Sequence, residues 1–271
     1  MRRIRETTAR ASESGRKLLI PYLVAGDPDL DTTLALMHDL VIRGADIIEL
    51  GVPFSDPSAD GPVIQRGVER ALASATSIVK VLQLVSRFRQ QDALTPVVLM
   101  GYLNPLEIMG YEAFVEAAAE TGVDGVLVVD MPPAEAVDLD ALLQGADIDL
   151  IFLVAPTTSP ARAKLIAAQT SGYLYYVSLK GVTGAALTDY DSVQANIERL
   201  RALTDLPIVI GFGIRDANSA RAMAALSDGV VIGSALVEQI ATLTDITDSA
   251  SHIDDVAEII SIVRTSIDNI K

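Results

Sequence analysis

The sequence predicts a single-domain α/β fold, a (β/α)₈ or TIM barrel with an extra helix at its N-terminus. Short apolar runs rich in β-branched residues recur eight times along the 271 residues, and helical patterns lie between them. No linker rich in proline, glycine or serine divides the chain. Continuous apolar strands that alternate with helices are typical of a parallel sheet covered on both faces. Eight such units in a chain of this length favour a barrel over an open sheet.

The elements follow in order along the chain. Residues 1–17 predict a short amphipathic helix rather than a transit peptide, because Glu6 and Glu13 interrupt the basic character and no apolar core follows. The barrel is expected to occupy residues 18–271, and residues 252–271 should form its closing helix, since apolar residues recur there at helical spacing. The eight strands are expected at residues 18–24, 46–51, 96–101, 125–130, 149–155, 173–178, 207–212 and 228–234.

The connections agree with repeated βα units. A dinucleotide-binding fold requires GxGxxG after its first strand. Residues 24–31 instead read VAGDPDLD, which predicts a turn that caps the next helix. Later helices are expected to end at Gly44 and Gly122, each followed within two residues by an aspartate and then a strand.

The composition argues against several classes of protein. A net charge of −15 and a pI of about 4.4 oppose binding to nucleic acid or to anionic membranes. The absence of cysteine excludes disulfides and thiolate chemistry, and only His38 and His252 could supply imidazole, so a histidine-rich metal site is excluded too. We expect both histidines at the surface. No apolar run reaches the ~18 residues of a membrane span, and we expect a cytoplasmic protein.

The first candidate catalytic residue is Glu49, which lies near the C-terminal end of the second predicted strand. Its neighbours Ile47, Ile48 and Leu50 are apolar. Function in a barrel gathers at this end of the strands. Burial raises the pKa of a carboxyl group, which suits a general acid or base. A structural ion pair across the mouth of the barrel is the alternative, and the local pattern leaves both open.

The loop after this strand, FSDPSADGPVIQ, is longer than most βα connections and is therefore a candidate functional loop. Asp56 and Asp60 lie in it, and either could face Glu49 across a substrate. Both also lie in turn-forming sequences, Asp-Pro and Asp-Gly-Pro, so an Asx turn explains each equally well. The spacing of the two aspartates along the chain does not show which of them is functional.

Glycine-rich loops follow the last three predicted strands, as KGVTG, GFGI and IGSA. Barrels often bind phosphate there with backbone N–H groups and a helix N-terminus. The expected phosphate cradle consists of the N–H groups of Gly184, Gly213, Gly233 and Ser234, with the Ser234 hydroxyl. Lys180 suggests a competing chemistry, because a desolvated lysine could form a Schiff base with a carbonyl substrate; its place at the start of a flexible loop favours exposure instead.

Several longer motifs resemble one family. They are IPYLVAGDPD, ELGVPFSDPSADGP, PVVLMGYLNP, GVDGVLVVDMPP, SLKGVTGA and PIVIGFGI, spread over residues 18–240. Together they are similar to the tryptophan synthase alpha chain. The resemblance implies a (β/α)₈ barrel that cleaves indole-3-glycerol phosphate to indole and glyceraldehyde 3-phosphate by a retro-aldol reaction in tryptophan biosynthesis. It also implies no cofactor in this chain, and an α₂β₂ complex in which indole passes to a beta chain that carries pyridoxal phosphate.

The resemblance also implies residue roles. Glu49 matches the acid/base catalyst and Asp60 the second carboxylate. The side chains expected to line the indole pocket are Tyr22, Met100, Tyr102, Leu127, Tyr175 and Phe212. The residues expected at the phosphate site and its closing loop are Thr183, Gly184, Gly213, Gly233 and Ser234.

The chain departs from the family pattern at a few positions. Ser58 stands where the family often has leucine, and residues 128–133 read VVDMPP where VPDLPP is more usual. Both lie near surfaces that the family uses to meet its beta chain, so they bear on partner affinity more than on chemistry. Leu179 and Lys180 stand where the family often has a pair of residues that contains arginine, just before GVTG. The remaining alternatives are an aldolase that uses Lys180 and a subunit kept as an allosteric activator of a beta chain, with weak catalysis of its own. A third is a different phosphate-binding barrel of indole or histidine biosynthesis, and the loop that contains Asp60 argues against it.

Overall fold

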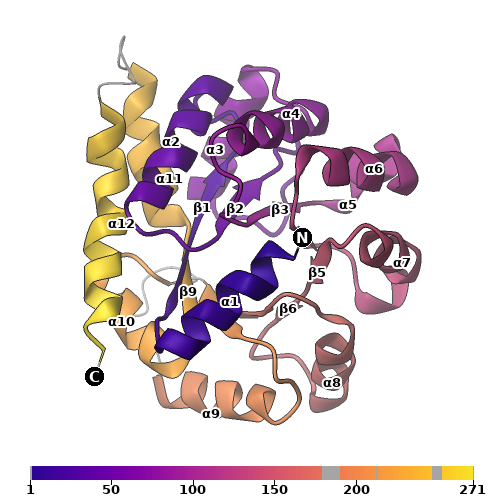
Figure 1. The fold of residues 1–271 in the computed structure, drawn as a ribbon, viewed down its shortest axis with the longest axis vertical. Coiled ribbons are helices and arrows are strands. Elements are labelled where there is room, and N and C mark those ends of the chain that lie inside the picture. The colour runs from indigo at the N-terminus through magenta and orange to yellow at the C-terminus, as the bar shows by residue number, and fades with distance from the viewer. Residues whose placement is uncertain (1, 179–189, 212, 246–251, 271) are drawn as a thin grey trace.

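The computed structural model describes residues 2–178, 190–211, 213–245 and 252–270. Parallel strands form a barrel, and helices surround it (Figure 1). The strands are β1 (Leu18–Val24), β2 (Ile48–Gly51), β3 (Val97–Gly101), β4 (Gly125–Val128), β5 (Asp149–Ile151), β6 (Leu153–Val154), β7 (Leu174–Val177), β8 (Ile208–Gly211) and β9 (Gly229–Ile232).

The strand order explains how nine short strands make an eight-stranded barrel. The order is β5-β4-β3-β2-β1-β9-β8-β7-β6. β5 and β6 are separated only by Phe152, and β5 pairs with β4 while β6 pairs with β7. The two pieces are therefore halves of one strand that joins the ends of the sheet. This confirms the predicted (β/α)₈ barrel.

The helices cover the outside of the barrel, apart from the first (Figure 1). They are α1 (Arg3–Ser14), α2 (Leu30–Ile42), α3 (Pro62–Ala73), α4 (Ile78–Arg89), α5 (Leu103–Met109), α6 (Tyr111–Thr121), α7 (Val137–Gly145), α8 (Pro160–Gln169), α9 (Tyr190–Arg201), α10 (Ala217–Leu226), α11 (Ser234–Ile240) and α12 (Ile253–Asp268). No single helix in the described ranges is long and apolar enough to cross a membrane; α3 and α4 pass that test only as a pair, and they are bent by 92°.

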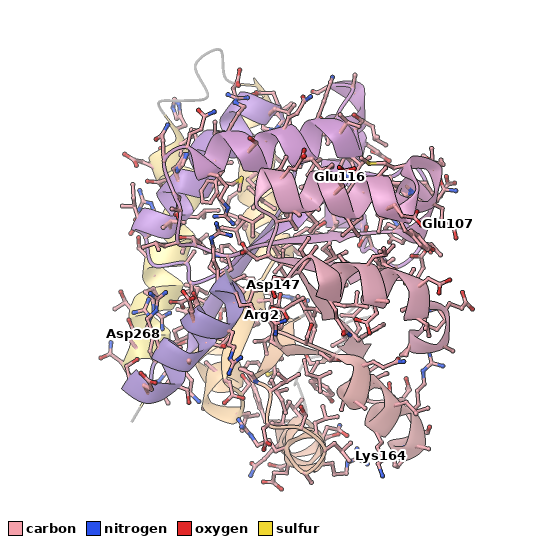
Figure 2. The ribbon with its side chains drawn as sticks, turned by 45° about the vertical axis from the view of Figure 1, so that its right-hand side comes forward. Arg2, Glu107, Glu116, Asp147, Lys164 and Asp268 are labelled. Carbon is pink, nitrogen blue, oxygen red and sulfur yellow. The ribbon has the colours of Figure 1, made fainter. Side chains whose placement is uncertain are left out.

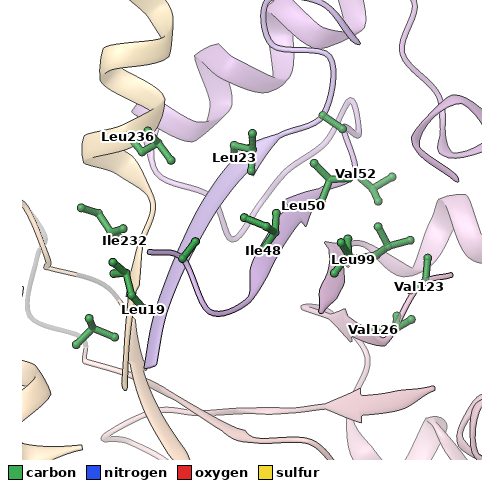
Figure 3. Close-up of a cluster of buried hydrophobic side chains, with 14 of the residues drawn as sticks. Leu19, Leu23, Ile48, Leu50, Val52, Leu99, Val123, Val126, Ile232 and Leu236 are labelled. Atoms are coloured by element: carbon green, nitrogen blue, oxygen red, sulfur yellow. The ribbon is translucent and has the colours of Figure 1, made fainter. Parts of the chain in front are cut away.

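Two apolar clusters hold the strands in place. Leu19, Leu23 and Leu50 belong to the larger cluster, which fills the space between the barrel and its helices (Figure 3). Ile20 and Val98 belong to the smaller cluster, composed mainly of strand side chains that point into the barrel. Alternate side chains of a strand point to opposite faces, so both faces of these strands are apolar and their sequences read as continuous apolar runs.

Helix α1 closes the N-terminal end of the barrel. Ile4 is fully buried and belongs to the inner cluster. Its Cδ1 atom lies 2.9 Å from the place where a Cβ on Gly125 would be, so glycine at the start of β4 leaves room for this side chain. Arg3 donates to Asp124 at 2.8 Å, which ties the helix to the residue before β4. The predicted extra N-terminal helix is confirmed.

Other polar contacts at this end join distant segments. Arg2 pairs with Asp147, which follows α7, at 3.0 Å (Figure 2), although an exposed pair of this kind adds little stability. Arg264 of α12 is buried and donates to the Lys17 carbonyl and to Asp46 at 2.9 and 3.0 Å. The closing helix is thus held at the same end as α1.

The expectation that both histidines lie at the surface is wrong for His38. Its ring stacks on Phe88, with centroids 4.8 Å apart, and its Nε2 atom is buried without a hydrogen-bond partner in the described part of the chain. Burial lowers the pKa of His38. The neutral imidazole therefore serves as packing between α2 and α4.

Replacing Ile4 by alanine should leave a cavity at the sealed end of the barrel. We expect the free energy of unfolding to fall by about 2–5 kcal/mol, the usual range for a buried isoleucine. Ile42→Ala is the matched control, because Ile42 is 81% exposed, and it should change stability by less than about 0.5 kcal/mol. Urea unfolding at constant m-value measures both, and equal effects would contradict the role given to Ile4.

Candidate active site

Glu49 lies on β2, and its side chain is inside the barrel. Its side chain is fully buried, and its cross-strand neighbours are Tyr22 on β1 and Val98 on β3. Tyr173 donates a hydrogen bond to Oε1 at 2.6 Å, and Oε2 is buried without a partner among the described residues. None of the ion pairs found in those residues involves Glu49, so the structural ion pair has no support.

Burial raises the pKa of Glu49 to about 7, against the opposing effect of the Tyr173 hydrogen bond, which favours the carboxylate. A group with this pKa is present in both protonation states near neutral pH. It can therefore give and accept a proton within one reaction cycle.

Tyr173 is a site residue that the sequence reasoning missed. It directly precedes β7, is fully buried, and lies two residues before Tyr175, which was expected in the site. Residues two apart in a strand face the same way. The alternation of side chains could therefore have predicted Tyr173, since an inward-facing Tyr175 places Tyr173 inside the barrel as well.

Asp60 lies in the loop that joins β2 to α3 and is partly buried. A turn with a hydrogen bond from Asp60 N to Pro57 O at 3.0 Å places it just before the helix. Tyr102 accepts a hydrogen bond from Ala59 N at 3.0 Å and so holds the loop against β3. Burial raises the pKa of Asp60 to about 6, while its hydrogen bond with Tyr102 acts in the opposite direction.

Asp56 occupies a different environment in the same loop. Its side chain is exposed and accepts a hydrogen bond from Ser55 at 2.6 Å, and its carbonyl accepts one from Ser58 N at 2.8 Å. These contacts shape the turn. The burial of Asp60 and the exposure of Asp56 thus separate two residues that spacing could not.

A cavity opens beside Asp60 at the C-terminal end of the barrel. Its lining consists of Tyr22, Val52, Phe54, Asp60, Val68, Met100, Gly101, Tyr102 and Val129. Three of the expected pocket residues, Tyr22, Met100 and Tyr102, therefore surround one carboxylate. Most of the remaining wall is apolar, as a site for an aromatic ring requires.

The other expected pocket residues lie deeper or cannot be placed. Leu127 and Tyr175 are buried in the inner cluster, and Leu127 also borders a small neighbouring hollow in the apolar core. The Tyr175 hydroxyl would be 1.9 Å from a Cβ on Gly211, so β8 must carry glycine there. Phe212 lies outside the described residues.

The expected phosphate residues are only partly described. Gly213 follows β8 with φ +79°, a left-handed conformation that favours glycine. Gly233 follows β9, and Ser234 is the first residue of α11. Both loops lie at the C-terminal ends of adjacent strands. Thr183, Gly184 and Lys180 lie outside the described residues.

No group of three or more histidine, cysteine, aspartate or glutamate side chains in the described segments could hold a metal ion. The chemistry that the site does offer is proton transfer by two carboxyl groups of raised pKa at the mouth of a barrel. The fold and the site together define a (β/α)₈-barrel enzyme of the acid–base type.

Comparison with known proteins gives the family. The tryptophan synthase alpha chain profile matches residues 8–266. The tryptophan synthase alpha chain of Thioalkalivibrio sulfidiphilus is 54% identical over 268 residues, which cover 99% of this chain and 100% of that one. The crystal structure of tryptophan synthase subunit alpha from Legionella pneumophila superposes with a TM-score of 0.91 at 41% identity and covers 100% of both chains. This chain belongs to the tryptophan synthase alpha chain family.

Membership in the family gives the reaction. The alpha chain is a lyase of tryptophan biosynthesis that cleaves indole-3-glycerol phosphate to indole and glyceraldehyde 3-phosphate. It needs no cofactor, and pyridoxal phosphate belongs to the beta chain. A tryptophan synthase complex from Pyrococcus furiosus is also similar, with a TM-score of 0.81 at 33% identity over 91% of this chain and 97% of that one.

Removing the Tyr173 hydroxyl should raise the pKa of Glu49 further, because its hydrogen bond to Oε1 favours the charged form. For Tyr173→Phe we expect the midpoint near pH 7 in the pH–rate profile to move up by about one unit, the equivalent of one hydrogen bond of about 1.4 kcal/mol. Tyr190→Phe, at a 41% exposed tyrosine, should leave the midpoint unchanged. A midpoint that stays in place in both variants would refute this assignment.

Proposed function

We propose that Glu49 is the proton shuttle of the retro-aldol cleavage and that Asp60 binds the indole N–H. The observation that carries the proposal is the fully buried Glu49 carboxyl group on β2, with its pKa raised to about 7. A carboxyl group with this pKa serves at neutral pH as both acid and base.

The reaction divides into two proton transfers with Glu49 as the common group. Neutral Glu49 first protonates C3 of the indole ring, which makes the ring an electron sink. The resulting carboxylate then takes the proton of the hydroxyl on the carbon attached to C3. The bond between C3 and that carbon breaks, its electrons return to the ring, and the hydroxyl oxygen becomes the aldehyde oxygen. Glu49 ends the cycle protonated, as it began.

Asp60 acts on the other side of the ring. Protonation at C3 places positive charge on the indole nitrogen, and a carboxylate that accepts the N–H hydrogen bond stabilises this charge as it develops. The proposal is supported by the place of Asp60 in the wall of the cavity, beside Tyr22, Met100 and Tyr102. Those three side chains, with Leu127, Tyr175 and Phe212, are proposed to surround the indole ring.

The phosphate group is proposed to bind at the ends of β8 and β9, through Gly213, Gly233 and Ser234. Thr183 and Gly184 are included from the family resemblance, and the loop that contains them is proposed to close over the substrate and exclude water. Backbone N–H groups allow a protein of net charge −15 to bind an anion locally.

We also propose that the chain works in an α₂β₂ complex, in the cytoplasm, and passes indole to the beta chain. The proposed contact surface is formed by the loops at residues 53–54, 104–106 and 131–133. Its support is apolar exposure nearby, since Ile108 on α5 is 80% exposed and Val137 on α7 is 58% exposed. Exposed apolar groups of this kind mark interaction surfaces when they gather at one edge.

Replacing Glu49 by glutamine removes the titrating group and keeps its size. We expect indole release from indole-3-glycerol phosphate to fall by about 10²- to 10⁴-fold, the range for a general acid–base residue. Glycerol 3-phosphate should bind with nearly unchanged affinity, because the phosphate loops are untouched. Glu120→Gln, an exposed change of the same kind on α6, should keep full activity.

Two rival readings predict other results for the same variants. A Schiff-base aldolase built on Lys180 would retain activity in Glu49→Gln, and borohydride would trap substrate on the lysine. A subunit kept as an activator, with weak catalysis of its own, would release little indole without a beta chain. Wild-type turnover by Glu49→Gln would therefore end the proposed assignment.

The two aspartates of the β2–α3 loop provide a matched pair. Asp60→Asn should lower kcat by about 10²- to 10³-fold, as removal of one electrostatic contact to a charged transition state does. Asp56→Asn removes the same charge from the same loop but at an exposed turn, and should leave kcat of the isolated chain within about twofold. Steady-state indole release measures both, and an unaffected rate in Asp60→Asn would return that residue to a turn-forming role.

A further inference from the structure

The ring of Tyr22 lies across the mouth of the barrel. At one edge it contacts the end of β9, where a Cβ on Gly233 would lie 3.5 Å from its Cδ1 atom. Its hydroxyl reaches the end of β2, where a Cβ on Gly51 would lie 2.4 Å from the oxygen. Gly51 thus makes room for the hydroxyl, whereas a Cβ on Gly233 would be in ordinary van der Waals contact with the ring. The ring spans the distance between the expected phosphate loop and the strand that carries Glu49.

The hydroxyl of Tyr22 has unused hydrogen-bonding capacity. Tyr22 lines the cavity beside Asp60, yet no hydrogen bond found between described residues uses its hydroxyl. Of the other tyrosines near the carboxyl groups, Tyr173 donates to Glu49 and Tyr102 accepts from Ala59 N, whereas Tyr175 does not line this cavity. A buried hydroxyl normally has a partner. A cavity-lining hydroxyl without a protein partner is therefore available to a ligand.

The surroundings make this hydroxyl a hydrogen-bond donor. Burial and the nearby carboxyl groups of Asp60 and Glu49 raise the pKa of Tyr22 well above its usual value. The phenol accordingly keeps its proton at any pH at which the enzyme works. Its partner must be an acceptor, and the most favourable acceptor is an oxygen on which negative charge develops.

The position of the hydroxyl indicates which part of the substrate it meets. Tyr22 and Glu49 are register partners on adjacent strands, so their side chains enter the barrel at the same level. If indole lies beside Asp60 and phosphate beside Gly233, the carbon chain between them must pass over the Tyr22 ring. The hydroxyl carbon next to indole then lies between Glu49 and the Tyr22 hydroxyl.

We propose that Tyr22 is a further catalytic residue, whose hydroxyl donates a hydrogen bond to the substrate oxygen that Glu49 deprotonates. This inference rests on the proposed function of Glu49. As the O–H proton moves to Glu49, negative charge grows on the oxygen until the aldehyde forms, and the donor stabilises that charge. Tyr22 keeps its proton throughout, and no bond to the phenol is made or broken.

The test is Tyr22→Phe in the full chain, assayed alone and with its beta chain. The variant keeps the ring and its packing against Gly233 and removes only the hydroxyl. We expect kcat for indole release to fall about 10- to 100-fold with KM within about threefold, because the hydrogen bond forms chiefly in the transition state. Tyr190→Phe should leave both constants unchanged.

Further measurements separate catalysis from packing. Urea unfolding of Tyr22→Phe should match wild type, and calorimetry should give a dissociation constant for glycerol 3-phosphate within twofold of wild type. An unchanged kcat would overturn the proposal, as would a raised KM with normal kcat, or a loss of rate that only parallels weaker glycerol 3-phosphate binding. Full activity in Glu49→Gln would instead show that the proposed function itself is wrong, whatever Tyr22→Phe does.

Discussion

The burial of the Glu49 carboxyl group is the constraint on which the site depends. An unpaired charge in an apolar interior is costly, and the barrel accommodates it in two ways. Tyr173 donates one short hydrogen bond, and the pKa near 7 lets the group take up a proton. The same burial that penalises the charge raises the pKa, which suits the proton shuttle that we propose. The environment that produces this pKa depends on a sealed barrel, and Ile4 of α1 closes the end opposite the reaction.

The two ends of the barrel consequently have different tasks. Ion pairs at the N-terminal end, around Asp124 and Asp46, bind α1 and α12 to the strands. At the C-terminal end, Arg70 of α3 makes a two-pronged contact with the fully buried Asp27, at 2.7 and 2.8 Å. Because α3 begins two residues after Asp60, this contact anchors the helix that follows the loop with Asp60. The ion pairs thus stabilise the helices that close the barrel and the helix that follows Asp60.

Local patterns in the sequence predicted much of this arrangement. Apolar runs mark strands because parallel strands in a barrel are buried on both faces, and glycines such as Gly122, in a left-handed conformation after α6, mark the ends of helices. Glu49 was identifiable because a lone carboxylate in such a run is costly. Asp60 could be preferred to Asp56 only by family resemblance, since both form turns. Their difference in burial appears only in the tertiary structure, where Tyr102, which follows β3, contacts the loop beside Asp60.

The eight-unit barrel and the residue types of its site can thus be read from the sequence, since periodicity and turn chemistry act over a few residues. Three features cannot be read from the sequence: the closure of the barrel at Phe152, the hydrogen bond between Tyr173 and Glu49, and the position of Tyr22 between Gly51 and Gly233. Each joins residues from different strands, and 124 positions separate Tyr173 from Glu49. Such contacts depend on the register in which the strands close, and that register follows from the packing of the whole barrel.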